Sequence, residues 1–320
     1  SLKYYQLAIE AKPLNEEEKV KQNEIKQFMA NRAFQKWIDQ EEWSKVTMAI
    51  HKEVKENKRK LDDENFKLLL FAENQKTGRA KYNGILDAYA LLEKYDKQKT
   101  LTLESQIDQG YAAEKLGGYK RAKIYYRRAL NKAPDENVDL ILQLVGELKR
   151  LYERSKDHKS LVQIYKRAYG ALKKSSGPKK ELRTYAYLIG YHQFFHLKQN
   201  KNARIWLLRS DGGGTSAQEL QSAYWVAKLD QLAKKPEIAL KRLKELSGRK
   251  ISKKSPLYVQ IHFELGTLFH LKENWDSALR HFRFAAKASA PEEFKNIQKV
   301  AEENAKQIAD YLKSIKASQG

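Results

Sequence analysis

Small, aromatic and charged residues alternate along the chain at intervals typical of paired amphipathic helices. The segment from Gly110 to Pro134 shows the pattern most clearly. Counted from Gly110, positions at intervals of 7, 9, 12, 16, 19 and 24 are Gly117, Tyr119, Ala122, Tyr126, Ala129 and Pro134. Steps of three and four residues place side chains on one helix face. The segment therefore predicts two helices, the second ending before a proline that cannot continue a helix interior.

A second copy of this pattern lies near the end of the chain. Counted from Gly266, intervals of 9, 12, 16, 19 and 25 fall on Trp275, Ala278, Phe282, Ala285 and Pro291. Four of these intervals match those of the first copy to the residue. Because such agreement across distant segments is unexpected by chance, the sequence predicts an internal repeat.

These two segments resemble the tetratricopeptide repeat, a helix–turn–helix unit of about 34 residues. In that family a small residue in the first helix lets the second helix approach closely. The resemblance implies an all-α fold, a right-handed α-solenoid of about seven helix pairs with a C-terminal capping helix. The residues that it assigns to packing between helices are Gly110, Ala122, Tyr126, Ala129, Pro134, Gly190, Ala227, Ala239, Gly266, Trp275, Ala278, Phe282 and Ala285.

Weaker copies lie between and before the two clear ones. Segment 181–210 places Gly190 at the small position but has Ala203 one residue late. Segment 220–247 keeps Ala227, Pro236, Ala239 and Leu243 in register, and segment 138–174 carries Leu161, Tyr165 and Ala168 as a second-helix stripe. Segments 31–54 and 64–95 are expected to be degenerate helix pairs.

The two ends are expected to cap the array. Asn15, followed by Glu16, Glu17 and Glu18, has the character of a helix N-cap with acidic residues in the first turn. A solenoid also needs a final helix that covers its last repeat. In the C-terminal segment, the residues expected on one apolar face are Phe294, Ile297, Ala301, Ile308, Leu312 and Ile315.

The resulting organisation has three parts. Residues 1–100 hold degenerate helical repeats, residues 101–290 hold repeats that are clearest at 103–134 and 259–291, and residues 291–320 form the capping helix. No long linker interrupts the chain, so one continuous array is expected, and the places where a bend could still occur are 173–180 and 210–216.

Composition agrees with this expectation and narrows the function. Glycine (15) and proline (6) are scarce, as in helical proteins. The chain has no cysteine, which excludes disulfides and thiolate metal sites. No apolar run approaches the roughly 20 residues that span a bilayer. The chain begins at Ser1 without a methionine, so a removed signal peptide or anchor is compatible with it.

Positive charge is concentrated in one stretch. The net charge is +22, and residues 151–250 contribute 14 of it, with 22 Lys and Arg against 8 Asp and Glu. This asymmetry indicates a basic surface for an acidic protein, nucleic acid or anionic polymer, although lysines used only for solubility would give the same count. The basic-patch candidates are Lys173, Lys174, Lys179, Lys180, Lys241, Arg242, Lys244, Arg249, Lys250, Lys253 and Lys254.

Candidate chemistry is sparse. The loop from Asp211 to Ser216 is rich in glycine, but it lacks the Lys-Ser/Thr of a P-loop and is expected to be a turn. His192 and His196 have the i, i+4 spacing of a zinc site but no third ligand in the sequence pattern, so packing roles are favoured and no metal or other cofactor is expected. His262, His270 and His281 are scattered, and no catalytic motif is present. We expect a protein that is not an enzyme.

The resemblance implies that partners bind in a concave groove lined by first helices. The positions concerned are Ile107, Tyr111, Glu114, Tyr187, Tyr191, Phe194, Tyr224, Lys228, Gln231, Phe263, Thr267 and His270. Half of these residues are aromatic, and aromatics are favoured binding anchors, although some of them could instead pack against neighbouring repeats. The Lys and Asn clamp of one chaperone-tail subclass is absent, since its positions hold Ile107, Tyr111, Phe263 and Thr267.

The sequence therefore predicts a scaffold that holds a protein or peptide partner with acidic and apolar residues. A bacterial, periplasmic or envelope-associated assembly is expected by analogy. The alternative is a helical-repeat protein that binds nucleic acid, peptidoglycan or lipopolysaccharide through its basic region, and an enzyme is the most distant possibility.

Overall fold

A computed structural model describes residues 19–20, 34–56, 61–289 and 291–319, and these residues form helices and turns without a β-strand. The predicted all-α class is therefore confirmed for this part of the chain. The predicted N-cap at Asn15 and its three glutamates lie outside the described residues. The chain divides into two compact units, Ser1–Ala133 and Pro134–Gly320.

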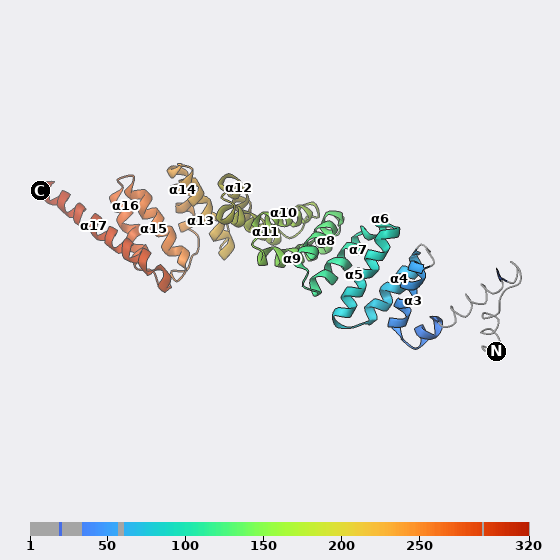
Figure 1. Cartoon of the computed structure of the whole chain (residues 1–320). Helices are drawn as coiled ribbons and strands as arrows, with labels where there is room; N and C mark the ends of the chain where they lie inside the picture. The colour runs from blue at the N-terminus through green and yellow to red at the C-terminus, as the bar shows by residue number, and fades with distance from the viewer. Residues whose placement is uncertain (1–18, 21–33, 57–60, 290, 320) are drawn as a thin grey trace. The chain divides into compact units, whose positions relative to one another are not determined.

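Unit 1 is built from helices that pack in chain order (Figure 1). Residues 34–39 are helical, and each of the longer helices that follow contacts the next one. The helices are α3 (Trp43–Glu56), α4 (Asp63–Gln75), α5 (Gly78–Tyr95), α6 (Lys97–Thr100), α7 (Leu103–Lys115) and α8 (Tyr119–Lys132).

Unit 2 continues the same plan through four further pairs and a final helix. Consecutive helices pack together, and α11 also contacts α13, which contacts α15, so that the first helices of successive pairs lie side by side. The elements are α9 (Val138–Arg154), α10 (His158–Lys174), α11 (Lys179–Tyr191), the π-helix η1 (His192–His196), α12 (Asn200–Ser210), α13 (Ala217–Leu232), α14 (Pro236–Ser247), α15 (Pro256–His270), α16 (Trp275–Ala286), the 3₁₀ turn η2 (Glu292–Phe294) and α17 (Lys295–Gln319).

The small residue of each clear repeat lies directly against the second helix. A Cβ added to Gly110 would lie 2.7 Å from the Tyr126 ring, and one added to Gly266 would lie 2.7 Å from the Phe282 ring. Both rings are buried, with 3% and 1% of their surface exposed. The glycines thus allow each pair of helices to close around an aromatic side chain.

The remaining packing residues also lie where the repeat places them. The alanines at these positions are fully buried, whereas Trp275 is half-buried and Pro134 is exposed just after the last turn of α8. The buried alanines are Ala122, Ala129, Ala227, Ala239, Ala278 and Ala285.

The one-residue delay in segment 181–210 has a structural cause. Gly190 packs against Leu207, 17 residues later, whereas the two clear repeats use a separation of 16. Between them lies η1, where the Leu197 N–H donates to the His192 carbonyl over five residues, at 3.1 Å. A π-turn takes up one extra residue in a helix. The delayed Ala203 therefore keeps its buried position.

Left-handed residues recur in the turns within the pairs. Gly117, Lys198, Lys234 and Glu273 all have positive φ, between 55° and 80°. Each lies seven residues after the small residue of its repeat, or eight where η1 intervenes. A left-handed residue after a helix is a common way to end it. The interval of seven seen at Gly117 is thus a general property of these turns.

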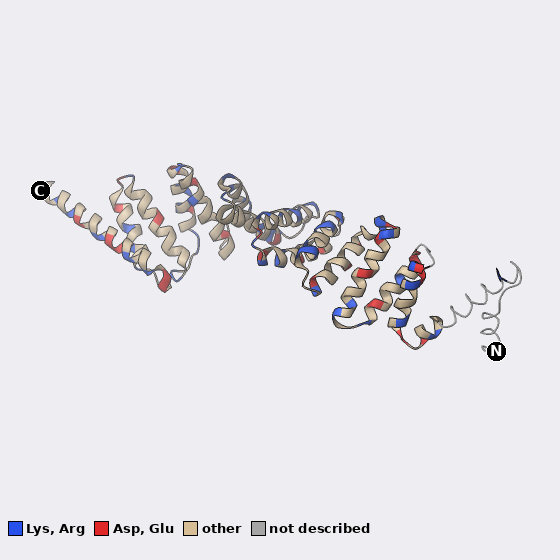
Figure 2. Cartoon of the chain, viewed as in Figure 1, with Lys and Arg blue, Asp and Glu red and all other residues tan. Residues whose placement is uncertain are grey.

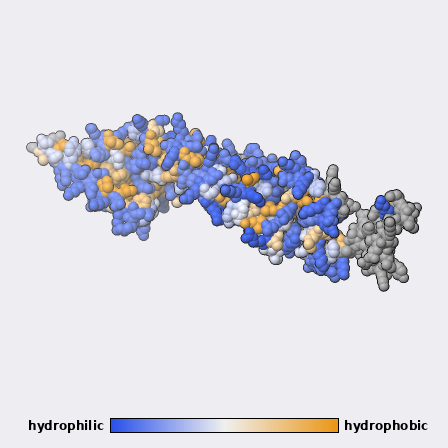
Figure 3. Space-filling view, viewed as in Figure 1, coloured by the Kyte–Doolittle hydropathy of each residue, from blue (hydrophilic) through white to orange (hydrophobic). Residues whose placement is uncertain are grey.

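The C-terminal helix α17 covers the last repeat. Ala301 and Ile308 are buried, and Ile297 and Leu312 pack at the edge of the same core, so the predicted apolar face is confirmed at these positions. Its outer surface carries both acidic and basic residues (Figure 2). On the face drawn in Figure 3, hydrophobic side chains form small patches separated by hydrophilic ones.

The division into units differs from the predicted boundaries at residues 100 and 290. It falls between Ala133 and Pro134, where the first clear repeat ends, and not at either predicted bend. Among the described helices, none is both long enough and apolar enough to cross a membrane.

A glycine comparison tests the close approach of paired helices. We expect Gly266→Ala to lower the free energy of unfolding by about 1–3 kcal/mol, because the new methyl group meets the buried Phe282 ring. The control is Gly146→Ala in α9, where an added Cβ has nothing within 4 Å. That change should stabilise the protein by about 0.5–1 kcal/mol through helix propensity. Urea unfolding followed by circular dichroism measures both, and equal effects would refute the packing role.

A buried histidine pair predicts acid sensitivity. The Nδ1 atoms of His262 and His281 lie 2.9 Å apart, a hydrogen bond that needs at least one neutral ring. Burial lowers the pKa of His262 to about 4, and burial, assisted by His262, Arg280 and Lys244, lowers that of His281 to about 4. Both rings are therefore neutral at pH 7 in the folded protein.

Between about pH 6.5 and pH 4 the unfolded chain binds protons that the folded chain does not, so stability falls as pH falls. The expected slope is about 1.4 kcal/mol per pH unit for each histidine. His281→Gln should flatten this dependence, whereas Leu265→Ala should lower stability at every pH without changing the slope. Denaturant unfolding at several pH values checks this, and an unchanged slope in His281→Gln would contradict it.

Candidate functional site

The predicted groove residues of unit 1 form a small surface on α7. Tyr111 is 46% exposed, and its ring lies 5.8 Å from that of Tyr82 and 5.1 Å from the Lys115 ammonium. Ile107 is half-buried. The Glu114 carboxylate accepts a hydrogen bond from the Tyr126 hydroxyl at 3.4 Å, so it is tied to the repeat's packing aromatic. Tyr111 is therefore the accessible member of this set.

In unit 2, five half-buried rings form a continuous surface, which we name the aromatic cluster. From Tyr187, ring centroids step by 6.0 Å to Tyr191, 4.7 Å to Phe195 and 4.8 Å to Trp225. Phe194 lies 4.7 Å from Phe195 and 5.5 Å from Trp225. The cluster thus joins α11, η1 and α13, and its rings are held by one another in fixed orientations.

A polar contact holds the Tyr187 end of the cluster. The Tyr187 hydroxyl donates to the Gln221 amide oxygen at 2.8 Å, which links α11 to α13. Burial raises the pKa of Tyr187, and Tyr191 adds to the effect. The hydroxyl is therefore a hydrogen-bond donor at neutral pH.

Tyr224 differs from its predicted role. It is only 4% exposed and belongs to the core around α13 to α17, and burial raises its pKa further. The accessible ring at this point is its neighbour Trp225, whose centroid lies 5.0 Å away. The two positions differ by one residue on α13, and the sequence register, counted back three residues from Ala227, selects Tyr224.

The other predicted groove positions on α13 are engaged with α15. Lys228 Nζ lies 2.6 Å from one Glu264 oxygen, and Gln231 donates to the other at 3.0 Å. All three side chains are half-buried. These residues bridge successive first helices, so their polar groups are already partly satisfied.

The predicted groove positions on α15 differ in how accessible they are. Phe263 is half-buried beside Phe282, with ring centroids 5.7 Å apart, and the Thr267 hydroxyl donates to the Phe263 carbonyl at 3.0 Å. His270 is exposed, and its ring lies 5.1 Å from that of Trp275. None of these contacts joins them to the aromatic cluster.

An open pocket of about 560 Å³ adjoins the cluster. Trp225 and Gln221 of α13 line one side, Leu257 and Gln260 of α15 line another, and Lys250 adds a cation. The pocket therefore offers an apolar wall, amide groups, one positive charge from Lys250 and one negative charge from Glu293 beside the exposed edge of an aromatic surface.

Sequence reasoning missed Phe195 and Trp225. The missed signal for Phe195 was the late Ala203, because the extra residue of η1 changes the direction in which the following side chains point. Trp225 had no comparable signal, since the position three residues before Ala227 falls on the adjacent Tyr224.

Most of the predicted basic patch is exposed. Nine of its eleven members are exposed lysines, but Arg242 and Arg249 are half-buried and paired. Arg249 binds Asp211 through both guanidinium nitrogens, at 2.7 and 3.0 Å. Arg242 Nε lies 2.9 Å from Asp230, a carboxylate that also binds Arg204 Nε at 2.7 Å. These two arginines hold the fold together and do not face a partner.

The glycine loop is closed by its own contacts. The Asp211 carboxylate that binds Arg249 also accepts from the Gly213 N–H at 3.0 Å. Ser216 caps α13 by accepting from the Glu219 N–H, and Glu219 in turn binds Arg183. An added Cβ at Gly212 would meet the Arg183 guanidinium at 2.1 Å. The loop is thus a turn that carries an ion-pair network, as expected.

The chain repeats one unit, a pair of helices joined by a turn. The clear repeats close on an aromatic ring at a glycine, and left-handed residues recur in the turns. A final helix covers the last pair. The chain has the tetratricopeptide-repeat fold. Six complete pairs, from α4–α5 to α15–α16, lie within the described residues, and α3 with residues 34–39 adds a partial one. The predicted number of about seven agrees with this arrangement.

Comparisons with known proteins add fold-level similarity. No family model matches the sequence, and no curated protein matches it. Among solved structures, MamA is similar with a TM-score of 0.40 and 16% identity over 62% of this chain and 95% of MamA. Yeast Tom70 is similar with a TM-score of 0.40 and 16% identity, over 92% of this chain and 61% of the Tom70 chain. The TPR2AB domain of yeast Sti1, solved in a pHSP90 complex, is similar with a TM-score of 0.35 and 16% identity. The match covers 88% of this chain and 98% of the Sti1 chain.

Removal of the buried Asp230 carboxylate tests the structural role of the ion pairs that it forms with Arg204 and Arg242. Asp230 is 0% exposed, so Asp230→Ala leaves two partly buried guanidinium groups unpaired. It should lower the free energy of unfolding by about 3–5 kcal/mol. Lys241→Ala, at the exposed patch residue beside Arg242, should change it by less than about 0.5 kcal/mol. Chemical denaturation compares the two, and a neutral Asp230→Ala would show that the network is dispensable.

Proposed function

We propose that this tetratricopeptide-repeat chain is a non-enzymatic scaffold that binds a protein segment on the aromatic cluster of unit 2. The observation that carries the proposal is the continuous run of half-buried rings from Tyr187 to Trp225, which ends at an open pocket. Rings that are already ordered lose little conformational entropy when a partner covers them. Aromatic side chains are also the commonest anchors of binding energy.

The expected partner segment carries apolar residues and acidic residues. Apolar side chains would cover the rings and enter the pocket. Acidic side chains suit the 14 excess positive charges of residues 151–250, which include Lys250 of the pocket, where Glu293 is the one acidic residue of the lining. An extended or helical peptide of this kind fits the recognition modes that such grooves use.

Tyr187 gives a direct test. Peptides selected from a displayed library against the full chain should be enriched in acidic and apolar residues. We expect Tyr187→Ala to weaken their binding by at least about tenfold, since it removes an anchor ring and the hydrogen bond to Gln221. Fluorescence anisotropy measures the affinity.

The matched control for this test is Phe71→Ala, an aromatic residue of unit 1 that is 51% exposed. It should leave peptide binding unchanged. Equal losses in the two variants, or none in Tyr187→Ala, would remove the aromatic cluster from the proposal.

A second candidate is favoured by the nine exposed lysines of the basic patch. Binding of an anionic polymer such as nucleic acid, peptidoglycan or lipopolysaccharide would fall steeply with salt, because each neutralised phosphate or carboxylate releases counterions. Scaffold binding through apolar contacts would fall only slightly. Charge reversal at Lys253 and Lys254, which do not line the pocket, should weaken the first kind of binding much more than the second.

The proposed location of this protein is the periplasm or the envelope of a bacterial cell. The lack of cysteine is compatible with it. Cell fractionation with an antibody against the native protein tests the location.

A further inference from the structure

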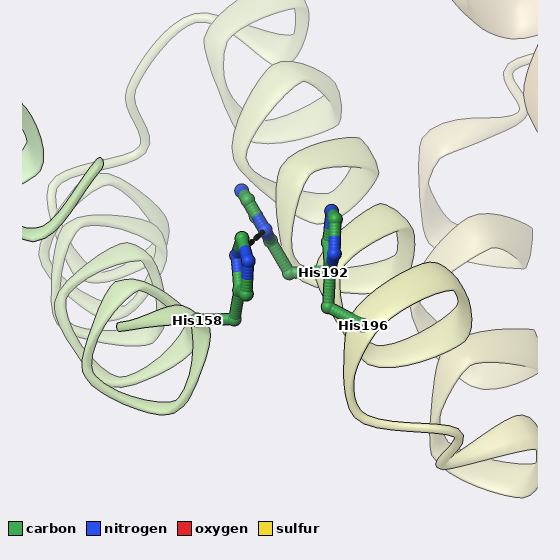
Figure 4. A group of neighbouring side chains, drawn as sticks. All are labelled: His158, His192 and His196. Carbon is green, nitrogen blue, oxygen red and sulfur yellow. Dashed lines mark hydrogen bonds between the residues drawn. The ribbon is translucent and has the colours of Figure 1, made fainter. Parts of the chain in front are cut away.

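Three histidines from two parts of unit 2 converge on one point (Figure 4). His192 and His196 belong to η1, and His158 is the first residue of α10. The sequence spacing offers only the first two, and the fold supplies the third from 34 residues earlier. Among the described residues this is the one group of its kind able to offer three ligand atoms to a metal ion.

The ring nitrogens are close together. The Nδ1 atoms of His158 and His192 lie 3.1 Å apart, and one nitrogen from each of the three rings lies within 4.8 Å of the others. Zinc binds histidine nitrogen at about 2.0–2.1 Å in a tetrahedral arrangement, which separates ligand atoms by about 3.3 Å. The ring nitrogens are therefore near the spacing of such a ligand set, and a change in ring orientation is also needed to direct their lone pairs at one ion.

The π-turn brings its two histidines to this point. It follows α11 directly, and its contacts with α10 place the start of that helix against it. Asp157 caps α10 by accepting from the Ser160 N–H at 3.1 Å, which fixes the residue before His158. π-turns occur often at functional sites. The backbone thus holds all three histidines on short, well-defined elements.

The chemistry of three imidazoles selects the ligand class. We propose that His158, His192 and His196 form a binding site for a zinc-class divalent cation, with a fourth coordination position open to water or another donor. Imidazole nitrogens suit Zn²⁺, Cu²⁺ and Ni²⁺, whereas Ca²⁺ and Mg²⁺ need oxygen ligands. Three histidines with one open position are a known zinc ligand set.

The rings differ in their freedom to rearrange. His158 and His196 stack with centroids 3.6 Å apart and planes within 6°, and two parallel rings cannot both direct an in-plane lone pair at one ion. One of them must rotate when the ion binds. His196 is exposed and His158 is half-buried, so both have room, while buried His192 is the fixed ligand.

The electrostatic surroundings bear on affinity. Burial, then His158 and His196, lowers the pKa of His192 to about 4, and burial and His158 also lower that of His196. The lone pairs of His192 and His196 are thus available at neutral pH. Lys149 and Lys198 contribute to these shifts and oppose a second positive charge. An anionic donor in the fourth position would offset that repulsion.

Bound metal would tie the beginning of α10 to η1. It would also lie beside the aromatic cluster, because the Tyr191 ring is 5.5 Å from His192 and 5.7 Å from His196. The site is independent of the proposed scaffold role, since no partner is needed to complete three ligands.

The test uses the full chain without an affinity tag. Isothermal titration with Zn²⁺ should show one site per chain, and Co²⁺ should give the intense visible absorption of a tetrahedral centre. His158→Gln and His196→Gln should each weaken Zn²⁺ binding by at least about tenfold. Zn²⁺ should raise the melting temperature of the wild type and not of these variants.

The matched control is His270→Gln, at an exposed histidine of α15, which should bind Zn²⁺ as the wild type does. Circular dichroism confirms that each variant is folded. Absence of a one-to-one site, or equal affinity in the control and the two ligand variants, would overturn the proposal. Displacement of Co²⁺ by excess Mg²⁺ would overturn it as well, since it would indicate oxygen ligands.

Discussion

The close approach of paired helices is the constraint on which the rest of this structure depends. Gly110 and Gly266 leave space that the Tyr126 and Phe282 rings fill, and any larger side chain would push the helices apart. A helix pair alone exposes its apolar faces, so each pair must stack on the next. The left-handed turns and the covering helix α17 follow from that requirement. Functional surfaces can then form only on the side chains that packing leaves free.

A single inserted residue shows how local geometry creates such surfaces. In unit 2, η1 preserves the contact between Gly190 and Leu207 by absorbing one residue into a π-turn. The side chains of that turn are consequently displaced from the ordinary repeat positions. Phe195 joins the aromatic cluster, while His192 and His196 turn toward α10. The same distortion thus serves both the proposed partner surface and the proposed metal site.

Charge in this protein has two separate roles. Buried carboxylates such as Asp230 and half-buried Asp211 hold arginines that a count of residues assigns to the surface. Their attraction offsets desolvation because each carboxylate is hydrogen-bonded. The nine lysines of the basic patch, by contrast, are exposed and supply a positive long-range field. The net charge therefore overstates the basic surface, and the paired arginines belong to the architecture.

Helical spacing and obligatory small residues are local properties, so the helix pairs and the capping helix can be predicted from the amino-acid sequence. Gly110 and Gly266 contact the Tyr126 and Phe282 rings, as the repeat spacing leads one to expect. Which aromatic rings stay accessible depends on packing between helices, since a rotation of one residue exchanges Tyr224 for Trp225. Packing between helices also brings His158 to the histidines of η1, because contacts between helices far apart in sequence leave no trace in spacing.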